Sequence, residues 1–219
     1  MNKNICVIVG VGPGMGMAIA RRFAKEDFKV ILVARRAEVL EKFENILAGE
    51  GYDVASYPAD VSNFELLRSI FERIEEKHGN PSVLIYNASL FRQASPMELH
   101  PEDLINDLRV NVAGALVAAK KVIPFMKYQK SGTILFTGGG QAIDPFYEYC
   151  SLAIGKAGIR NLCFSLAAEL KPFGIHVGTV TIMGSVQKGT RFDPNLIAEE
   201  FWKLHTESIE NFTVEVLYE

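Results

Sequence analysis

The sequence predicts an α/β fold: a Rossmann-like, doubly wound parallel sheet of about seven strands with helices on both faces. Three observations lead to it. Short apolar runs rich in β-branched residues alternate with longer segments of helical periodicity, a spacing typical of βαβ units. A glycine-rich turn directly follows the first apolar run. The chain has 219 residues, 48% of them hydrophobic, which suits one core of this type, so we expect residues 1–219 to form a single domain.

The first unit is a strand, a glycine turn and a helix. Residues 5–9 (Ile-Cys-Val-Ile-Val) are predicted to form a buried strand, and Met15, Ile19 and Phe23 lie four apart on one face of the helix that follows. The turn between them carries Gly10, Gly12, Gly14 and Gly16. Glycines let a backbone turn sharply and approach a pyrophosphate closely, and a helix N-terminus attracts phosphate. The unit therefore predicts a nucleotide site.

The remaining elements follow in alternation. Strands are expected at 28–34, 53–57, 82–86, 133–137, 176–183 and 212–217. The helices between them have apolar stripes at Val39, Leu40, Phe43, Ile46 and Leu47, at Leu67, Ile70, Phe71 and Ile74, and at Ile197, Phe201 and Leu204. A helix that Pro101 opens leads into a long one at about 112–129, and a second long helix spans about 148–170. Ligands of such sheets bind at the carboxyl ends of the strands.

Composition argues against several classes of partner. The net charge is −3 and the basic residues are scattered, which gives no footprint for nucleic acid. The N-terminal apolar run is too short for a signal segment or a membrane span, so we expect no membrane partner and a cytoplasmic location. Cys6, Cys150 and Cys163 show no C-x-x-C spacing, which predicts neither disulfides nor a metal site. A small molecule is the expected partner.

The glycine spacing distinguishes between two kinds of nucleotide turn. The pattern G-x-G-x-x-G would need glycine at 15 or 17, where the chain has Met15 and Met17. The chain fits G-x-x-x-G-x-G on Gly10, Gly14 and Gly16 instead, which resembles the coenzyme turn of the short-chain dehydrogenase/reductase family, with Val9 where that family usually has Thr. The resemblance covers nearly the whole chain and implies a coenzyme bound by Gly10, Gly12, Pro13, Gly14, Met15 and Gly16. A tight strand-to-helix connection is the alternative.

The end of the second strand indicates which coenzyme is bound. An acidic residue about 20 positions past the glycines would select NAD, whereas arginine accommodates a 2′-phosphate. The chain has Arg35 and Arg36 there, so NADP(H) is favoured over NAD(H). The alternative is that the two arginines only begin a solvated helix.

Further positions match the family after later strands. By resemblance, Asp60 and Val61 would contact the adenine, and Asn87, Ala88 and Ser89 would form the turn beside the coenzyme, with Ser89 replacing a glycine. Asp60-Val61 could equally be an ordinary signal for a helix N-terminus. Asn111 matches the helix asparagine that holds a water linked to the active-site lysine in this family.

The reacting segment departs from the family pattern Tyr-x-x-x-Lys. Aligning Lys156 with the family lysine, which holds the nicotinamide ribose, places Leu152 at the tyrosine position and Gly139 at the serine position. The proline of the Pro-Gly pair after the sixth strand is replaced by Met183, and Thr190 is displaced. The segment from Phe192 to the C-terminus resembles a divergent bacterial branch that lacks the usual serine and tyrosine.

Tyr149 is the nearest replacement for the lost proton donor. It precedes Leu152 and Lys156 at helical spacing, so its hydroxyl could point into the same cleft. The alternative is that Tyr149 is a wall of the substrate pocket or a core aromatic residue. Tyr147 is a weaker candidate of the same kind.

These observations predict an oxidoreductase that transfers hydride between NADP(H) and a small carbonyl or alcohol with a non-standard proton donor. The alternatives are a catalytically inactive NADP(H)-binding sensor or scaffold and, less favoured, a protein that binds flavin or another nucleotide. The two long helices resemble those that pair into a dimer interface in the family. Small residues would permit close approach there and imply a homodimer or homotetramer: Ala113, Gly114, Ala115, Ala118 and Ala119.

Overall fold

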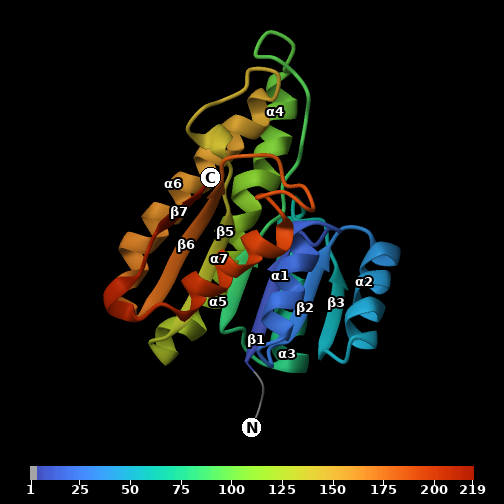
Figure 1. The fold of residues 1–219 in the computed structure, drawn as a ribbon, viewed down its shortest axis with the longest axis vertical. Helices are drawn as coiled ribbons and strands as arrows, with labels where there is room; N and C mark the ends of the chain where they lie inside the picture. The colour runs from blue at the N-terminus through green and yellow to red at the C-terminus, as the bar shows by residue number, and fades with distance from the viewer. Residues whose placement is uncertain (1–3) are drawn as a thin grey trace.

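A computed structural model describes residues 4–219 and shows one parallel sheet in the order β3-β2-β1-β4-β5-β6-β7 (Figure 1). Its strands are β1 (Ile5–Val9), β2 (Lys29–Ala34), β3 (Val54–Pro58), β4 (Val83–Tyr86), β5 (Gly132–Thr137), β6 (Ile175–Ile182) and β7 (Glu215–Tyr218). All six strand pairs are parallel. The order reverses direction beside β1, so the doubly wound α/β prediction is confirmed.

Helices cover both faces of the sheet. They are α1 (Met15–Ala24), α2 (Ala37–Gly49), α3 (Phe64–His78), α4 (Pro101–Leu108), α5 (Gly114–Gln129), α6 (Cys150–Leu170) and α7 (Pro194–Thr206). One core cluster joins the sheet to α3, α5 and α6, and the other joins it to α1, α2 and α7. Alternate residues of the buried strands supply the two clusters, which explains why these strands are continuously apolar. No described helix is both long and apolar enough to cross a membrane.

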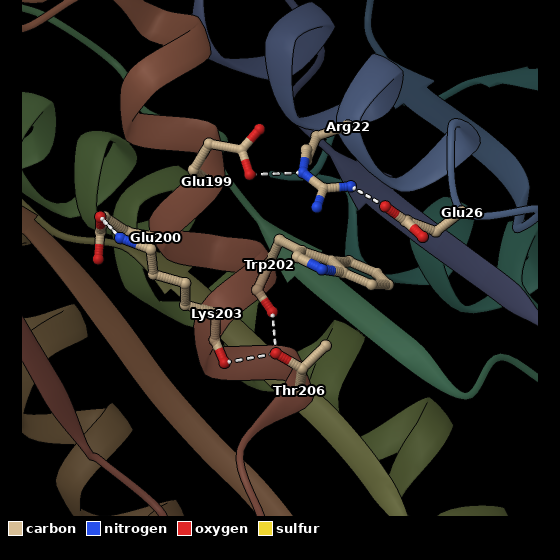
Figure 2. Close-up of polar contacts among 7 residues, drawn as sticks. All are labelled: Arg22, Glu26, Glu199, Glu200, Trp202, Lys203 and Thr206. Atoms are coloured by element: carbon tan, nitrogen blue, oxygen red, sulfur yellow. Dashed lines mark hydrogen bonds and ion pairs between the residues drawn. The ribbon is translucent and has the colours of Figure 1, made fainter.

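Helices α1 and α7 are held together by Arg22, although 177 residues separate it from its acidic partner on α7 (Figure 2). Its Nε donates to Glu199 at 2.7 Å and its Nη1 to Glu26, in the turn just after α1, at 2.7 Å. The guanidinium carbon lies 4.5 Å from the centroid of the Trp202 ring, close enough for a cation–π contact. The ion pairs of Arg22 with these exposed acids contribute little to stability by themselves, whereas its contact with the Trp202 ring adds apolar contact between the helices.

Three details differ from the sequence prediction. Ile46 was expected on the core stripe of α2 but is 48% exposed, so the stripe consists mainly of Leu40 and Leu47. The final strand begins at Glu215, three residues later than predicted. The residues that connect α4 and α5 form a π-helical turn, Arg109–Ala113.

Three of the small residues that were expected at a helix–helix interface between subunits pack inside their own chain instead. Ala115, Ala118 and Ala119 are fully buried in the core beneath the sheet of the same chain. A Cβ added at Gly114 would lie 2.6 Å from the Tyr86 hydroxyl, so this glycine allows α5 to approach β4. The small residues therefore fit α5 against its own sheet, because a short side chain is needed where helix and strand lie close together.

Candidate functional site

A cleft of about 820 Å³ opens at the carboxyl ends of the strands, where the loops after β1 to β6 meet. In Figure 1 these connections lie in the upper half of the view, with the loop leading to α4 at the top. Twelve of the predicted site residues line the cleft: Gly10, Gly12, Pro13, Met15, Gly16, Arg35, Arg36, Val61, Asn87, Ala88, Ser89 and Lys156. Four others do not line it: Gly14, Asp60, Asn111 and Tyr149.

Gly10 allows the glycine turn to pass directly over the end of β4. Its φ is +93°, and a Cβ there would lie 2.2 Å from the backbone nitrogen of Ala88. Gly16 has a similar steric reason, because a Cβ would lie 2.7 Å from the Cα of Val11. These two positions need glycine for backbone packing rather than for a ligand.

Gly12 and Gly14 have a different environment, with no atom of the described chain within 4 Å of an added Cβ. Gly14 precedes α1, which has no side-chain cap and no acidic residue in its first turn. The free N–H groups of this helix end, together with its dipole, favour an anion. The open backbone at Gly12 lines the cleft beside them, so the turn fits a diphosphate.

Asn87 ties three strands together below the cleft. Its Nδ2 donates to the carbonyl of Gly10 at 2.7 Å, and its Oδ1 accepts a 2.8 Å hydrogen bond from the Thr137 hydroxyl. These bonds connect the ends of β1, β4 and β5. The side chain of Asn87 therefore supports the floor of the cleft.

Arg35 and Arg36 follow β2, are exposed and line the cleft. Asp60 lies nearby but is engaged locally, since its Oδ1 accepts hydrogen bonds from the Ser62 N–H at 2.9 Å and the Ser62 hydroxyl at 2.7 Å. Partial burial raises the pKa of Asp60, but the Ser62 hydrogen bonds and the charge of Arg35 outweigh it and hold the pKa below its usual value. Asp60 thus organises the turn before α3, while Val61 faces the cleft.

Lys156 and Leu152 bring α6 to the other end of the cleft. The Lys156 Nζ donates to the carbonyl of Thr137 at 2.9 Å. Burial of this ammonium group lowers the pKa of Lys156 to about 8. Leu152, which is 2% exposed, contributes an apolar side chain, and Gly139 contributes only backbone.

Asn111 supports the site from behind. It is 5% exposed within the π-helical turn, and its Oδ1 accepts a 2.7 Å hydrogen bond from the Leu90 N–H. A Cβ at Gly155 would lie 2.7 Å from the Cβ of Asn111, so this glycine lets α6 pack against the turn. Asn111 therefore fixes the segment after Ser89 while its own side chain stays out of the cleft.

Tyr149 does not continue the helical face that the sequence suggested. It precedes the first residue of α6 and has φ −125° and ψ 46°, outside the helical range. Its backbone pairs with Ala94, which joins the segment before α6 to the loop after β4. Tyr149 is therefore the N-cap of α6, with its carbonyl accepting a 3.0 Å hydrogen bond from the Ala153 N–H, and of residues 149, 152 and 156 only the last two lie within the helix.

The sequence analysis named Ser89 as part of the turn beside the coenzyme but missed Gln141, a second polar residue of the cleft. The Ser89 hydroxyl and the Gln141 Oε1 are buried and have no hydrogen-bond partner among the described residues, and both residues line the cleft. Buried polar atoms without a partner are costly, which favours a polar ligand in the cleft. Gln141 lies just after β5, and its place beyond a strand end was the available signal.

The cleft fits a dinucleotide in volume and in the chemistry of its lining. Its size lies in the range of small-molecule sites, and it has an open backbone and a free helix end at one side, with two exposed cations beside them. Within residues 4–219, no group of three His, Cys, Asp or Glu side chains is placed to hold a metal ion.

Comparison with known proteins gives consistent matches. The family model for short chain dehydrogenase matches residues 4–193. The uncharacterized oxidoreductase YxjF of Bacillus subtilis is 31% identical over 82% of this chain and 70% of its own length. Oxidoreductase UcpA of Salmonella typhimurium is 30% identical over 80% of this chain, which spans 66% of that protein.

Solved structures show the same fold. A metagenomic short-chain oxidoreductase in complex with NADP has a TM-score of 0.90 at 24% identity, with 99% of this chain and 97% of that one covered. The L-sorbose reductase of Gluconobacter frateurii, complexed with NADPH and L-sorbose, is 26% identical with a TM-score of 0.79, over 83% of this chain and 70% of that one.

Proposed function

The chain belongs to the short-chain dehydrogenase family, and we propose that it is an oxidoreductase that uses NADP(H) to interconvert a small carbonyl compound and its alcohol. The observation that carries the proposal is the single cleft that joins the glycine turn, Arg35 and Arg36, and Lys156. The pair of cations, the anion site and the amine match the 2′-phosphate, the diphosphate and the nicotinamide ribose of a phosphorylated dinucleotide, respectively.

NADP(H) fits this order better than NAD(H). The diphosphate would lie at the uncapped end of α1, and the arginines after β2 would contact a 2′-phosphate. The L-sorbose reductase, which was solved with NADPH, has the same fold at 26% identity and supports the choice. When bound here, the reduced coenzyme supplies the hydride.

The described residues of the chain supply positioning and exclude water. Lys156 would hold the ribose next to the reacting ring, and Leu152 would keep that end of the cleft apolar. Neither Leu152 nor Gly139 can donate a proton, so the reaction requires a non-standard donor. Tyr149 is the donor suggested by its sequence position. If it acts, Tyr149→Phe abolishes turnover without weakening NADPH binding, and an unchanged rate excludes it.

A second candidate is an NADP(H)-binding sensor or scaffold without turnover. Leu152 and Gly139 favour this sensor or scaffold, because they leave the reacting end of the cleft without the usual hydroxyl groups. Incubation with NADPH deuterated at C4 and a panel of aldehydes, ketones and sugars separates the two functions. Deuterium in an alcohol product supports the enzyme, whereas NADPH binding with no deuterated product from any compound supports the sensor.

We also propose a homodimer or homotetramer through α5 and α6. Their outer surfaces expose Leu116, Tyr128, Ile154 and Phe164, which are 40%, 81%, 41% and 41% accessible. Exposed apolar side chains on two long helices suit a subunit contact. Light scattering at micromolar concentration should give a mass of two or four chains, and a monomer would contradict the assembly.

A further inference from the structure

Lys156 is the titratable side chain best placed to meet a reacting group. Its Nζ donates one hydrogen bond, to Thr137, and no other bond of this nitrogen is found within residues 4–219. An ammonium group has three donors, so two remain for atoms that enter the cleft. Leu152 precedes Lys156 by one turn of α6 and lines the same cleft with an apolar side chain.

The other titratable groups of the cleft are less suited to donate a proton. Among the titratable residues that the structure describes, only Arg35, Arg36 and Asp144 line it besides Lys156. All three are exposed, whereas Lys156 is half-buried. Arginine stays protonated in proteins and does not exchange its proton at neutral pH. No tyrosine, histidine or cysteine among the described residues lines the cleft.

Gly139 leaves the space through which the Lys156 side chain extends. A Cβ at Gly139 would lie 3.3 Å from both Cδ and Cε of Lys156, tighter than ordinary contact. With glycine there, the lysine extends past the end of β5 to Thr137 without displacement. The residue that replaces the usual serine therefore allows this position of the amine.

We propose that Lys156 is the proton donor for carbonyl reduction, a role that rests on the proposed function and assigns its missing acid. A hydride from the reduced nicotinamide dinucleotide forms the new C–H bond, and the π electrons of the carbonyl move onto its oxygen. That oxygen takes a proton from Nζ, so one N–H bond breaks and one O–H bond forms. The carbonyl is reduced by two electrons, the dinucleotide is oxidised by two, and the neutral amine regains a proton from water.

The electrostatic surroundings of Lys156 agree with this role. Burial alone lowers its pKa to about 8, near the operating pH that suits a general acid. Two acids near α6 are already paired, Asp107 of α4 with Arg92 and Glu215 of β7 with Arg160. Other charged or titratable groups near α6 or in the cleft are Arg109, Asp144, Tyr149, Cys150, Arg35 and Arg36.

The first test measures the amine itself, without catalysis. Protein labelled with ¹³C at lysine Cε is titrated by NMR with and without NADPH, and Lys156→Arg assigns the signal. We expect one lysine in the coenzyme-free protein to titrate near pH 8, at least about 1.5 pH units below the value of about 10.4 for a lysine in a model peptide. A Lys156 signal that titrates with the exposed lysines would overturn the inference.

The second test separates proton donation from charge and ribose binding. Lys156→Arg keeps the positive charge but removes a group that can release its proton near neutral pH. Lys156→Ala removes the amine and leaves space for a small amine added to the solution. We expect reduction of the best carbonyl in the panel to fall about 100-fold in both variants, and methylamine to restore at least about tenfold in Lys156→Ala only. NADPH affinity of Lys156→Arg should stay within about threefold of wild type. Lys42→Ala is the matched control and should keep the wild-type rate.

The outcomes distinguish this inference from the proposed function. A wild-type protein that binds NADPH but reduces no carbonyl overturns the function and the donor together. An active wild type in which Lys156→Arg keeps its rate, or Lys156→Ala shows no amine rescue, overturns the donor alone. In the active wild type, kcat/KM for reduction should fall above the Lys156 pKa measured in the NADPH complex, and a flat profile there also rejects the donor.

Discussion

Gly10 and Ala88 lie so close that a Cβ at Gly10 would stand 2.2 Å from the Ala88 backbone nitrogen. The glycine turn and the end of β4 are therefore packed backbone against backbone, and Asn87 reinforces the contact through its 2.7 Å hydrogen bond to the Gly10 carbonyl. The geometry of the cleft floor depends on this approach, because both segments line the cleft.

Gly10→Ala should destabilise the fold by more than about 3 kcal/mol, since it combines a left-handed backbone with a steric clash. Gly51→Ala is the matched control, because Gly51 has a similar φ of +89° but nothing within 4 Å of an added Cβ. Its expected cost is about 1–2 kcal/mol. Urea unfolding of both variants measures the difference, and equal losses would show that the contact with Ala88 is unimportant.

Leu152→Tyr should raise the rate of carbonyl reduction by more than about tenfold, because it places a phenol at the reacting end of the cleft. The larger side chain at a position that is 2% exposed should cost about 1–3 kcal/mol of stability. Leu152→Phe adds a ring without a hydroxyl. It should lose a similar amount of stability but show no increase in the rate of carbonyl reduction. Equal rates for the two variants would mean that a phenol there does not reach the substrate.

The ion pair beneath α4 should give the protein a defined response to acid. Asp107 is fully buried, accepts hydrogen bonds from Arg92 at 2.8 and 3.0 Å and from Ser151 at 2.7 Å, and so joins α4 to α6 and to the loop after β4. Burial raises the pKa of Asp107, but its bonds to Arg92 and Ser151 outweigh this and hold the pKa below the usual value.

Because its folded-state pKa is lowered, Asp107 stabilises the protein above the unfolded value of about 3.9 and loses this effect as the pH falls through the folded pKa. Asp107→Asn should therefore be less stable than wild type at pH 7, with a smaller difference at pH 3. Asp103→Asn is the control, since Asp103 lies 3.3 Å from Arg92 but is 38% accessible. A wild-type advantage over Asp107→Asn that is the same at both pH values would contradict the assignment.

The sequence predicted the sheet and the glycine turn that lines the cleft because their signals are local. Five consecutive apolar residues at Ile5–Val9 need burial on both sides, and Gly10 to Gly16 permit only a few backbone paths. Gly79, with a φ of +100°, likewise directly follows the last residue of α3. Each of these depends on residues close together in the chain.

The part of the cleft beside Lys156 was less accessible to sequence analysis because it depends on contacts between distant segments. Tyr149 has the spacing of a helical residue, but its backbone pairs with Ala94 and the helix starts after it. The sequence shows that Ala115 and Ala118 have small side chains, but it does not show whether they face a partner subunit or the sheet of their own chain, where the structure buries them. The unpartnered Gln141 Oε1 likewise appears only once the loops after β5 and β6 are folded together.

The central claim is that the cleft binds a phosphorylated nicotinamide dinucleotide through the glycine turn and the two arginines. Isothermal titration of the wild type and of an Arg35→Ala/Arg36→Ala double variant with NADPH and NADH tests it most directly. We expect the wild type to bind NADPH at least about tenfold more tightly than NADH, and the double variant to lose most of that preference. Failure of the wild type to bind either coenzyme at millimolar concentration would contradict the claim.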